Sequence, residues 1–162
     1  MASPALALAA AFLAPAALAF ETKRASVMET VTASEVAVLL EGKGHKTTEK
    51  IDSQGDPLLG VTSEAFNYQV LFYNCTEGRC DTVQYRLRWP VEGGFPLDAV
   101  NEFNKTGRLG RVYLDSAGDP TLELVAELCG GVTSAQLTYQ HDRFMRAGAG
   151  FKSHLAETHE KK

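Results

Sequence analysis

The sequence lacks the surplus of positive charge that nucleic-acid-binding domains usually carry. Its 162 residues include 16 lysines and arginines against 20 aspartates and glutamates, which gives a formal net charge of −4. Its N-terminal apolar run, LALAAAFLAPAALA, is shorter than the about 20 residues that a transmembrane helix needs. These two features predict a chain with no nucleic-acid partner and no membrane span.

Motifs of common enzyme classes are missing as well. The sequence contains no phosphate-binding loop and no dinucleotide-binding fingerprint. Ser53 and Ser116 fall in predicted turns, without the strand–turn–helix context that a nucleophilic serine requires. The sequence therefore gives no support to a hydrolase or a nucleotide-dependent enzyme.

The four histidines form no catalytic or metal-binding pattern. His45 lies in the loop after the first predicted helix. His141 lies on an apolar helical stripe, where a histidine is more often a core residue than a catalytic base. His154 and His159 are five positions apart, about 140° around a helix, so their side chains do not converge on one metal ion. We predict no enzyme activity, no cofactor and no metal site.

Cysteine is scarce: the chain has 3, so no second pair exists for a zinc site. Cys75 and Cys80 enclose the loop TEGR between two strand-like segments, where strand ends lie within reach of a disulfide. Their spacing differs from the C-x-x-C of thioredoxin-like redox sites. A structural disulfide is therefore favoured over two free thiols or a redox pair. Cys129 is left over, and we expect it to be half-buried at a strand end.

The first residues have the pattern of an export signal. A short apolar run ends in Ala17-Leu18-Ala19, the small-x-small pattern at which signal peptides are cut. The opening MASP supplies no basic residue, so an apolar N-terminal arm is the alternative. We predict a signal peptide over residues 1–19, a polar leader over 20–31 and a periplasmic location.

The rest of the chain alternates between helical and strand-like patterns. Helices are expected over residues 32–42 and 96–107 and from residue 133 onward. Thr32 and Glu35 form a capping box at the first of them. Four strands are expected between the first two helices and two between the last two. This order, α-ββββ-α-ββ-α, predicts an α+β fold: an antiparallel sheet covered by helices on one face.

Two segments predict which side chains face the core. The segment 82–89 alternates like a half-buried antiparallel strand, with Val83, Tyr85 and Leu87 on one face. Its other face carries Arg86 and Arg88. We expect the apolar face of the second helix to be formed by Leu97, Val100 and Phe103.

The motif D-S-x-G-D-P occurs twice, each time between strand-like segments. Aspartate at the start of a turn can accept backbone N–H groups, glycine supplies a positive φ, and proline restarts an extended chain. An EF-hand calcium loop is the alternative, but it needs a glutamate at position twelve that neither copy has. We therefore predict two structural turns. Their residues are Asp52, Gly55, Asp56, Pro57, Asp115, Gly118, Asp119 and Pro120.

The third helix carries one long apolar stripe. This stripe could cover the chain's own sheet. It could also pair two copies as a homodimer, since Gly148 would let a second backbone approach closely. Both alternatives stay open at this point. The stripe comprises Leu137, His141, Phe144, Gly148, Phe151 and Leu155.

The chain resembles the YbjN-domain family of bacteria. The resemblance covers residues 32–157, followed by a solvated tail at 158–162. It is carried by FNYQVLFYNCTEGRC and by the block from Asn101 to Pro120, N-x-F-N-x-x-x-R-x-x-R-x-Y-L-D-x-x-G-D-P. Phe103 stands where family members often have tryptophan. The resemblance implies a fold like that of type III secretion chaperones, often dimeric, and a label of putative sensory-transduction regulator that assigns no reaction.

Three hypotheses about function follow. The first is a non-enzymatic periplasmic interaction or regulatory module that binds a protein partner, which an apolar groove between the first and third helices would favour. The second is a small-molecule or ion sensor that uses the open sheet face, and the third is a hydrolase. A possible binding patch for carboxylates is formed by Arg86, Arg88, Arg108 and Arg111. The alternative for these arginines is a solvated face with acidic neighbours.

Overall fold

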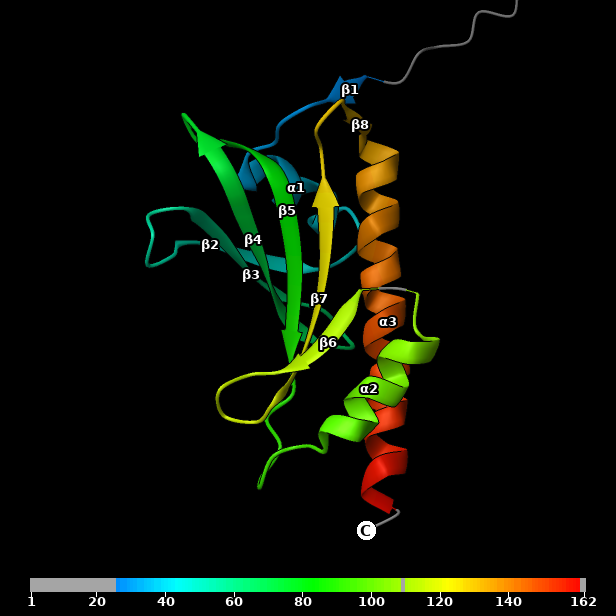
Figure 1. Ribbon diagram of the computed structural model, residues 1–162. Helices are drawn as coiled ribbons and strands as arrows, with labels where there is room; N and C mark the ends of the chain where they lie inside the picture. Colours follow the sequence, from blue (N-terminus) through cyan, green and yellow to red (C-terminus); the bar gives the residue numbers. More distant parts are fainter. Residues whose placement is uncertain (1–25, 109, 161–162) are drawn as a thin grey trace, which may run out of the picture.

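The structure is a computed structural model that describes residues 26–108 and 110–160 (Figure 1). The predicted signal peptide lies outside the described residues. The helices are α1 (Ala33–Glu41), α2 (Leu97–Thr106) and α3 (Ser134–Glu160). The strands are β1 (Val27–Met28), β2 (Lys46–Ile51), β3 (Pro57–Thr62), β4 (Asn67–Thr76), β5 (Arg79–Arg88), β6 (Arg111–Leu114), β7 (Pro120–Glu127) and β8 (Val132–Thr133).

Six strands form one antiparallel sheet in the order β2-β3-β4-β5-β7-β6, and β1 pairs with β8 in a separate two-stranded sheet. The register sets two rows of side chains across the large sheet. One row runs from Gln69 through Arg86 and Glu123 to Arg111. In the adjacent row, Arg88 pairs with Thr121, and Thr121 pairs with Tyr113. Both rows lie on the same face because successive residues of a strand alternate between faces.

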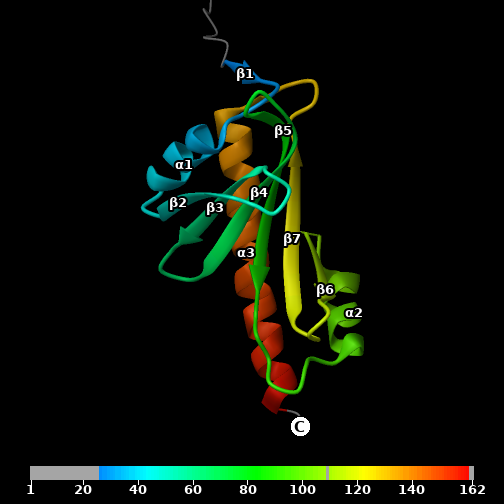
Figure 2. The ribbon, with the colours of Figure 1, turned by 90° about the vertical axis from the view of Figure 1, so that its left-hand side faces the viewer.

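All three helices lie against the other face of this sheet (Figure 2). Helix α3 packs on β5 and β7, α1 packs on β2 and β3, and α2 packs beside β6. In Figure 2 the strands β4, β5 and β7 stand in front of α3. No described helix covers their outer side. The predicted α+β architecture, with helices on one face of an antiparallel sheet, is confirmed.

Helix α1 begins at the predicted capping box. The Thr32 hydroxyl accepts the backbone N–H of Glu35 at 3.1 Å, and the Glu35 carboxylate accepts the N–H of Thr32 at 2.8 Å. Val31 and Val36, which flank this box, are both buried. Two otherwise unpaired N–H groups are thereby satisfied, so the helix start is fixed locally.

The apolar stripe of α3 packs on the chain's own sheet. Leu137, Phe144 and Phe151 are buried in the core between the helix and the strands. A Cβ on Gly148 would lie 3.2 Å from the Leu87 and Phe66 side chains, so this glycine allows the helix to approach its own sheet. A homodimer would therefore need a different surface.

Strands β4 and β5 form a hairpin closed by a disulfide. Cys75 and Cys80 are bonded, and their Cα atoms are 4.0 Å apart. Cys80 exchanges both backbone hydrogen bonds with Val31, so its position opposite Cys75 is a non-hydrogen-bonded pair, the closer kind in antiparallel sheets. The predicted disulfide is confirmed. The turn itself is shorter than expected, because only Glu77 and Gly78 lie between the strands.

The structure departs from the sequence predictions in several places. Residues 26–31, assigned to a polar leader, contribute β1 and the bridge from Val31 to Cys80. Helix α3 continues to Glu160, into the predicted tail. The inward placement of Leu97 is wrong, since this side chain is 60% exposed. Cys129 is exposed rather than half-buried, which also corrects the prediction.

Candidate functional site: the uncovered face of the sheet

The two D-S-x-G-D-P motifs form the β2–β3 and β6–β7 turns and repeat the same hydrogen bonds. In the first, the Asp52 carboxylate accepts the N–H groups of Gln54 and Asp56 at 2.8 and 3.0 Å. In the second, the Asp115 carboxylate accepts the corresponding N–H groups, of Ala117 and Asp119, at 2.9 and 3.0 Å. The glycine of each turn has a positive φ, as the motif requires. Both motifs are therefore local turn structures.

Only the second turn is built into the surface of the sheet. Asp119 is 6% exposed, and its carboxylate accepts the backbone N–H of Val91 at 2.7 Å and a terminal N–H of Arg88. Phe95 donates its N–H to the Gly118 carbonyl at 3.1 Å. These contacts connect the loop between β5 and α2 to the turn. The contact with Asp119 also fixes the position of the Arg88 guanidinium group.

A buried carboxylate organises the middle of the outer face. Glu123, on β7, accepts N–H groups of Arg86 and Arg111 and the hydroxyl of Tyr113, each at 2.9 Å. Only 3% of the Glu123 side chain is exposed. Burial alone would raise the pKa of Glu123, but hydrogen bonds from Arg111, Tyr113 and Arg86 outweigh burial and lower it. Glu123 is therefore a stable anion that pairs with two arginines.

Arg88 bridges two carboxylates across β7. Its Nε lies 2.7 Å from Asp115 Oδ2, while a terminal nitrogen contacts Asp119. Backbone hydrogen bonds, chiefly from Asp119, lower the pKa of Asp115, and Arg88 lowers it further. The arginine side chain stays 49% exposed. Asp115 is thus held as an anion, and part of its side chain stays accessible.

Three of the four arginines proposed for a patch gather here. Arg86, Arg88 and Arg111 lie on the uncovered face, each paired with at least one carboxylate. Arg108 is exposed and lies apart from them, and its carbonyl accepts an N–H of Arg143 at 3.3 Å. The patch in the structure is therefore a paired network of three arginines and three carboxylates.

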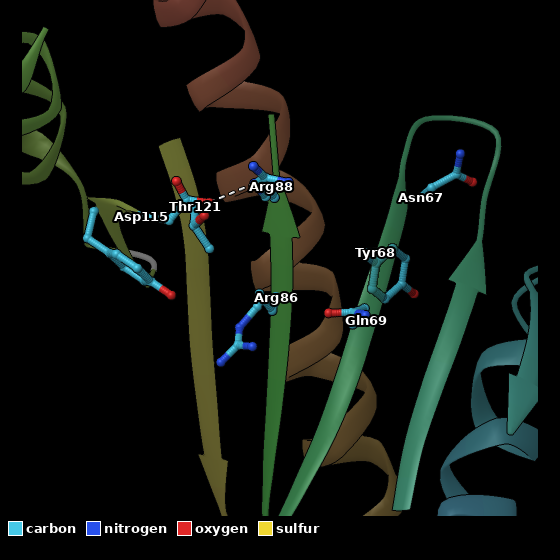
Figure 3. Close-up of a pocket in the computed structure, with 8 residues that line it drawn as sticks. Asn67, Tyr68, Gln69, Arg86, Arg88, Asp115 and Thr121 are labelled. Atoms are coloured by element: carbon cyan, nitrogen blue, oxygen red, sulfur yellow. Dashed lines mark ion pairs between the residues drawn. The ribbon is translucent and has the colours of Figure 1, made fainter. Parts of the chain in front are cut away.

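Next to this network the face is hollowed (Figure 3). The hollow has a volume of about 530 Å³ and opens between β4, β5, β7 and the end of β6. Figure 3 shows Gln69 and Arg86 on one side of it and Asp115, Thr121 and Arg88 together on another. Its lining residues are Asn67, Tyr68, Gln69, Arg86, Arg88, Tyr113, Asp115 and Thr121.

One polar atom in the floor of this hollow has no partner. Thr121 is 2% exposed, and its hydroxyl oxygen is buried without a hydrogen bond to any described residue. An unpaired buried hydroxyl costs about 1–3 kcal/mol in proteins. Such a group needs an explanation, and a ligand that pairs with it on binding is one.

The space between α1 and α3 offers no comparable site. It is lined by apolar side chains that include Val36, Leu39 and Leu137, and its volume is only about 10 Å³. That is room for about one water molecule. The apolar groove that would have favoured capture of a protein segment by the helices is closed in this structure.

His141 is a core residue, as its stripe position predicts. Its Nε2 lies 2.8 Å from the Tyr68 hydroxyl, and its Nδ1 lies 3.6 Å from Asp142 Oδ1, beyond hydrogen-bond length. Burial and the neighbouring His45 lower the pKa of His141 to about 4. His154 is bound elsewhere, with Nε2 2.8 Å from the Ala99 carbonyl oxygen. Neither histidine lines the hollow, and His141 is linked to it only through Tyr68.

Sequence reasoning missed the residues that complete the site. Glu123 lies in the mostly apolar segment LELVAEL, and its alternating position there was the available signal. That it faces Arg86 follows from the strand register. Tyr113 belonged to the recognised block but had no assigned role. Thr121 gave no signal, because its importance depends on the absence of a partner in three dimensions.

None of the helices in the described part of the chain is both long and apolar enough to cross a membrane. Across residues 26–108 and 110–160, no group of three or more histidine, cysteine or acidic side chains is arranged to hold a metal ion.

Fold and site together define a small α+β domain with helices on one sheet face and a polar hollow on the other. The chain belongs to the YbjN family, described as "putative bacterial sensory transduction regulator", which matches residues 32–157. The resemblance seen in the sequence is confirmed. No curated protein and no solved structure matches the chain. The likeness to type III secretion chaperones stays a prediction.

Proposed function

We propose that this chain is an exported regulatory domain that binds a segment of a partner protein on the uncovered face of its sheet. The observation that carries the proposal is the asymmetry of the sheet. The three described helices pack against one face of the sheet. The other face has a hollow of about 530 Å³ with polar side chains around it. Binding sites are typically concave, with placed polar groups that orient the ligand.

Export is supported by two features. The N-terminal apolar segment has the pattern of a cleavable signal. The Cys75–Cys80 disulfide is of a kind that persists in oxidising compartments such as the bacterial periplasm. We therefore place the mature protein in the periplasm.

Binding without catalysis is supported by the character of the site. Its arginines are held by Glu123, Asp115 and Asp119, and its remaining groups are amides and hydroxyls. Such groups recognise polar ligands by hydrogen bonding. The family description, a sensory transduction regulator, likewise names regulation and no reaction.

A sensor for a small molecule is the second candidate. The volume of the hollow falls within the range of about 300–1,000 Å³ seen for small-molecule pockets. Under this alternative the same face binds a free ligand, and no protein segment contacts the strands around the hollow.

Photo-crosslinking from two matched positions tests the proposal. Val125 on β7 is 44% exposed on the uncovered face, and Tyr139 on α3 is 52% exposed on a helix. A photoreactive residue is placed at one position or the other in cells, and crosslinked peptides are sequenced from the periplasmic fraction. We expect one defined segment of one partner to crosslink from position 125 and not from 139. Equal labelling from both positions, or labelling only in the cytoplasm, would contradict the proposal.

A further inference from the structure

We infer that the hollow is a carboxylate-binding site in which Arg88 binds the ligand carboxylate. While no ligand is present, the Asp115 side chain takes the place of that carboxylate on Arg88. The ligand group is the side-chain carboxylate of an acidic segment in the partner. The inference rests on the proposed function and names the chemistry that this face recognises.

Arg88 is held by two carboxylates of unequal character. Asp119 is buried and also binds the Val91 N–H, so it is a fixed part of the fold. Asp115 is more exposed, with 25% of its side chain accessible, and its ion pair with Arg88 lies at the surface. Exposed ion pairs contribute little to stability, so this second contact can open at small cost.

Asp115 does not depend on Arg88 for its own position. Its Oδ1 accepts two backbone N–H groups within the turn, and Oδ2 alone contacts the arginine. The equivalent Asp52 keeps the same turn hydrogen bonds with no arginine partner among the described residues. Asp115 can therefore release Arg88 while the turn stays intact.

The unpaired hydroxyl lies beneath this ion pair. Strand β7 runs between β5 and β6, so the side chain of Arg88 crosses β7 to reach Asp115. Thr121 is the β7 residue paired with Arg88, and Figure 3 shows it beside Arg88 and Asp115. A ligand carboxylate that replaces Asp115 on Arg88 uncovers the Thr121 hydroxyl, which then has an acceptor.

Arg86 supplies the second cationic contact. Its Nε binds Glu123, and neither of its terminal nitrogens has a hydrogen-bond partner among the described residues. A guanidinium group can bind a carboxylate with these nitrogens while its Nε stays in place. Arg86 lies one row away from Arg88 on the same strand and the same face.

The charge balance selects the kind of anion. Arg86, Arg88 and Arg111 are matched by Asp115, Asp119 and Glu123, so the three positive and three negative charges sum to zero. A phosphate dianion would add two negative charges to this neutral network. A single carboxylate adds only one and takes over the contact with Arg88 that Asp115 gives up, so a carboxylate is the ligand group that fits.

The test is a titration of the folded protein followed by amide NMR shifts. The probes are a blocked pentapeptide with a central glutamate, the same peptide with glutamine, and free glutamate. At millimolar concentrations we expect the glutamate peptide to shift the Thr121 and Arg88 amides and the glutamine peptide to leave them unchanged. No shift with the glutamate peptide, or equal shifts with both peptides, overturns the inference.

Four variants make the test specific. Thr121→Val should weaken binding of the glutamate peptide about tenfold, and Thr121→Ser should restore it, because a hydrogen bond to a charged group contributes this much. Asp115→Asn keeps the turn acceptor and should strengthen binding several-fold. Asp52→Asn makes the same charge change in the other turn and should have no effect. Unchanged affinity in Thr121→Val, or equal effects of the two asparagine variants, overturns the inference.

The two proposals fail in different ways. If free glutamate binds as tightly as the peptide, the carboxylate site stands and the protein-segment function fails in favour of a small-molecule sensor. If crosslinking from position 125 captures a defined partner while no probe carboxylate binds, the function stands and the carboxylate site fails.

Discussion

At the scale of single residues, buried carboxylates fix the positions of the arginine side chains on the outer face. Glu123 is almost inaccessible and receives three donors, and Asp119 is buried beside Arg88. From the sequence, the arginines could form a binding patch or a solvated face with acidic neighbours, and Arg86, Arg88 and Arg111 each have an acidic neighbour in the structure. The structure shows that Arg86 is also a structural partner, which changes what its substitution does.

Arg86→Glu is expected to destabilise the fold. It places a carboxylate against Glu123 and removes one of that residue's cationic partners, which for a buried ion pair costs about 3 kcal/mol or more. The control Arg108→Glu makes the same charge change at an exposed site and should alter the free energy of unfolding by less than about 0.5 kcal/mol. Urea unfolding measures both. Equal small effects would mean that Glu123 does not need Arg86.

His141 is expected to make stability depend on pH. Burial and His45 lower its pKa to about 4 in the fold, against an ordinary value of 6.5. The unfolded chain therefore binds the proton more readily, and stability is lost as pH falls from about 6.5 to about 4. The full effect is about 3 kcal/mol.

The measurement compares the native protein with His141→Gln, which keeps an acceptor for the Tyr68 hydroxyl. Its unfolding free energy should fall less steeply between pH 6.5 and pH 4. His45 also has a lowered pKa, through burial and then Lys43, so some slope remains in the variant. Asp142, with a lowered pKa, titrates below this window. Identical slopes would show that His141 is not the responsible group.

At the scale of elements, one motif serves two purposes. Both D-S-x-G-D-P turns satisfy their own backbone in the same way, which explains why the sequence repeats. Only the second is packed against the loop after β5, so its last aspartate became buried. The hydrogen bonds within the turn are the same in both copies, and the two turns differ only in how they pack against the rest of the protein.

Matched substitutions at the fifth position of the motif measure this difference. Asp119→Ala leaves Arg88 and the Val91 N–H without a buried partner and should cost about 3 kcal/mol or more. Asp56→Ala removes a side chain with no partner among the described residues and should cost less than about 1 kcal/mol. Thermal unfolding of both variants provides the comparison. Equal costs would contradict a structural role confined to the second turn.

The hairpin disulfide is expected to make a modest contribution. It closes a very short loop, and in the chain-entropy model such a loop stabilises the fold by about 2 kcal/mol. Unfolding with and without a reductant measures this difference. The fold should survive reduction, because Cys80 is also held by backbone hydrogen bonds to Val31. Complete unfolding on reduction would show that the core is weaker than its packing indicates.

At the scale of the whole molecule, the sequence predicted the architecture better than the site. Periodicity and caps located the three helices and the six strands of the large sheet, because these signals are local. β1 and β8 were missed because each has only two residues and depends on its partner. Arg86 and Arg88 were found from alternation on β5 and Arg111 from the recognised block, whereas Glu123 and Thr121 required the register of β5, β7 and β6.

The central claim is that the Thr121 hydroxyl on the uncovered face is unpaired in the free protein and pairs with a ligand on binding. The unfolding free energy of Thr121→Val, measured without any ligand, tests it most directly. If the Thr121 hydroxyl is unpaired in the free protein, its removal should leave stability unchanged or raise it by about 1 kcal/mol. A loss of more than about 1 kcal/mol would show that the hydroxyl already has a partner in the free protein, and would contradict the account.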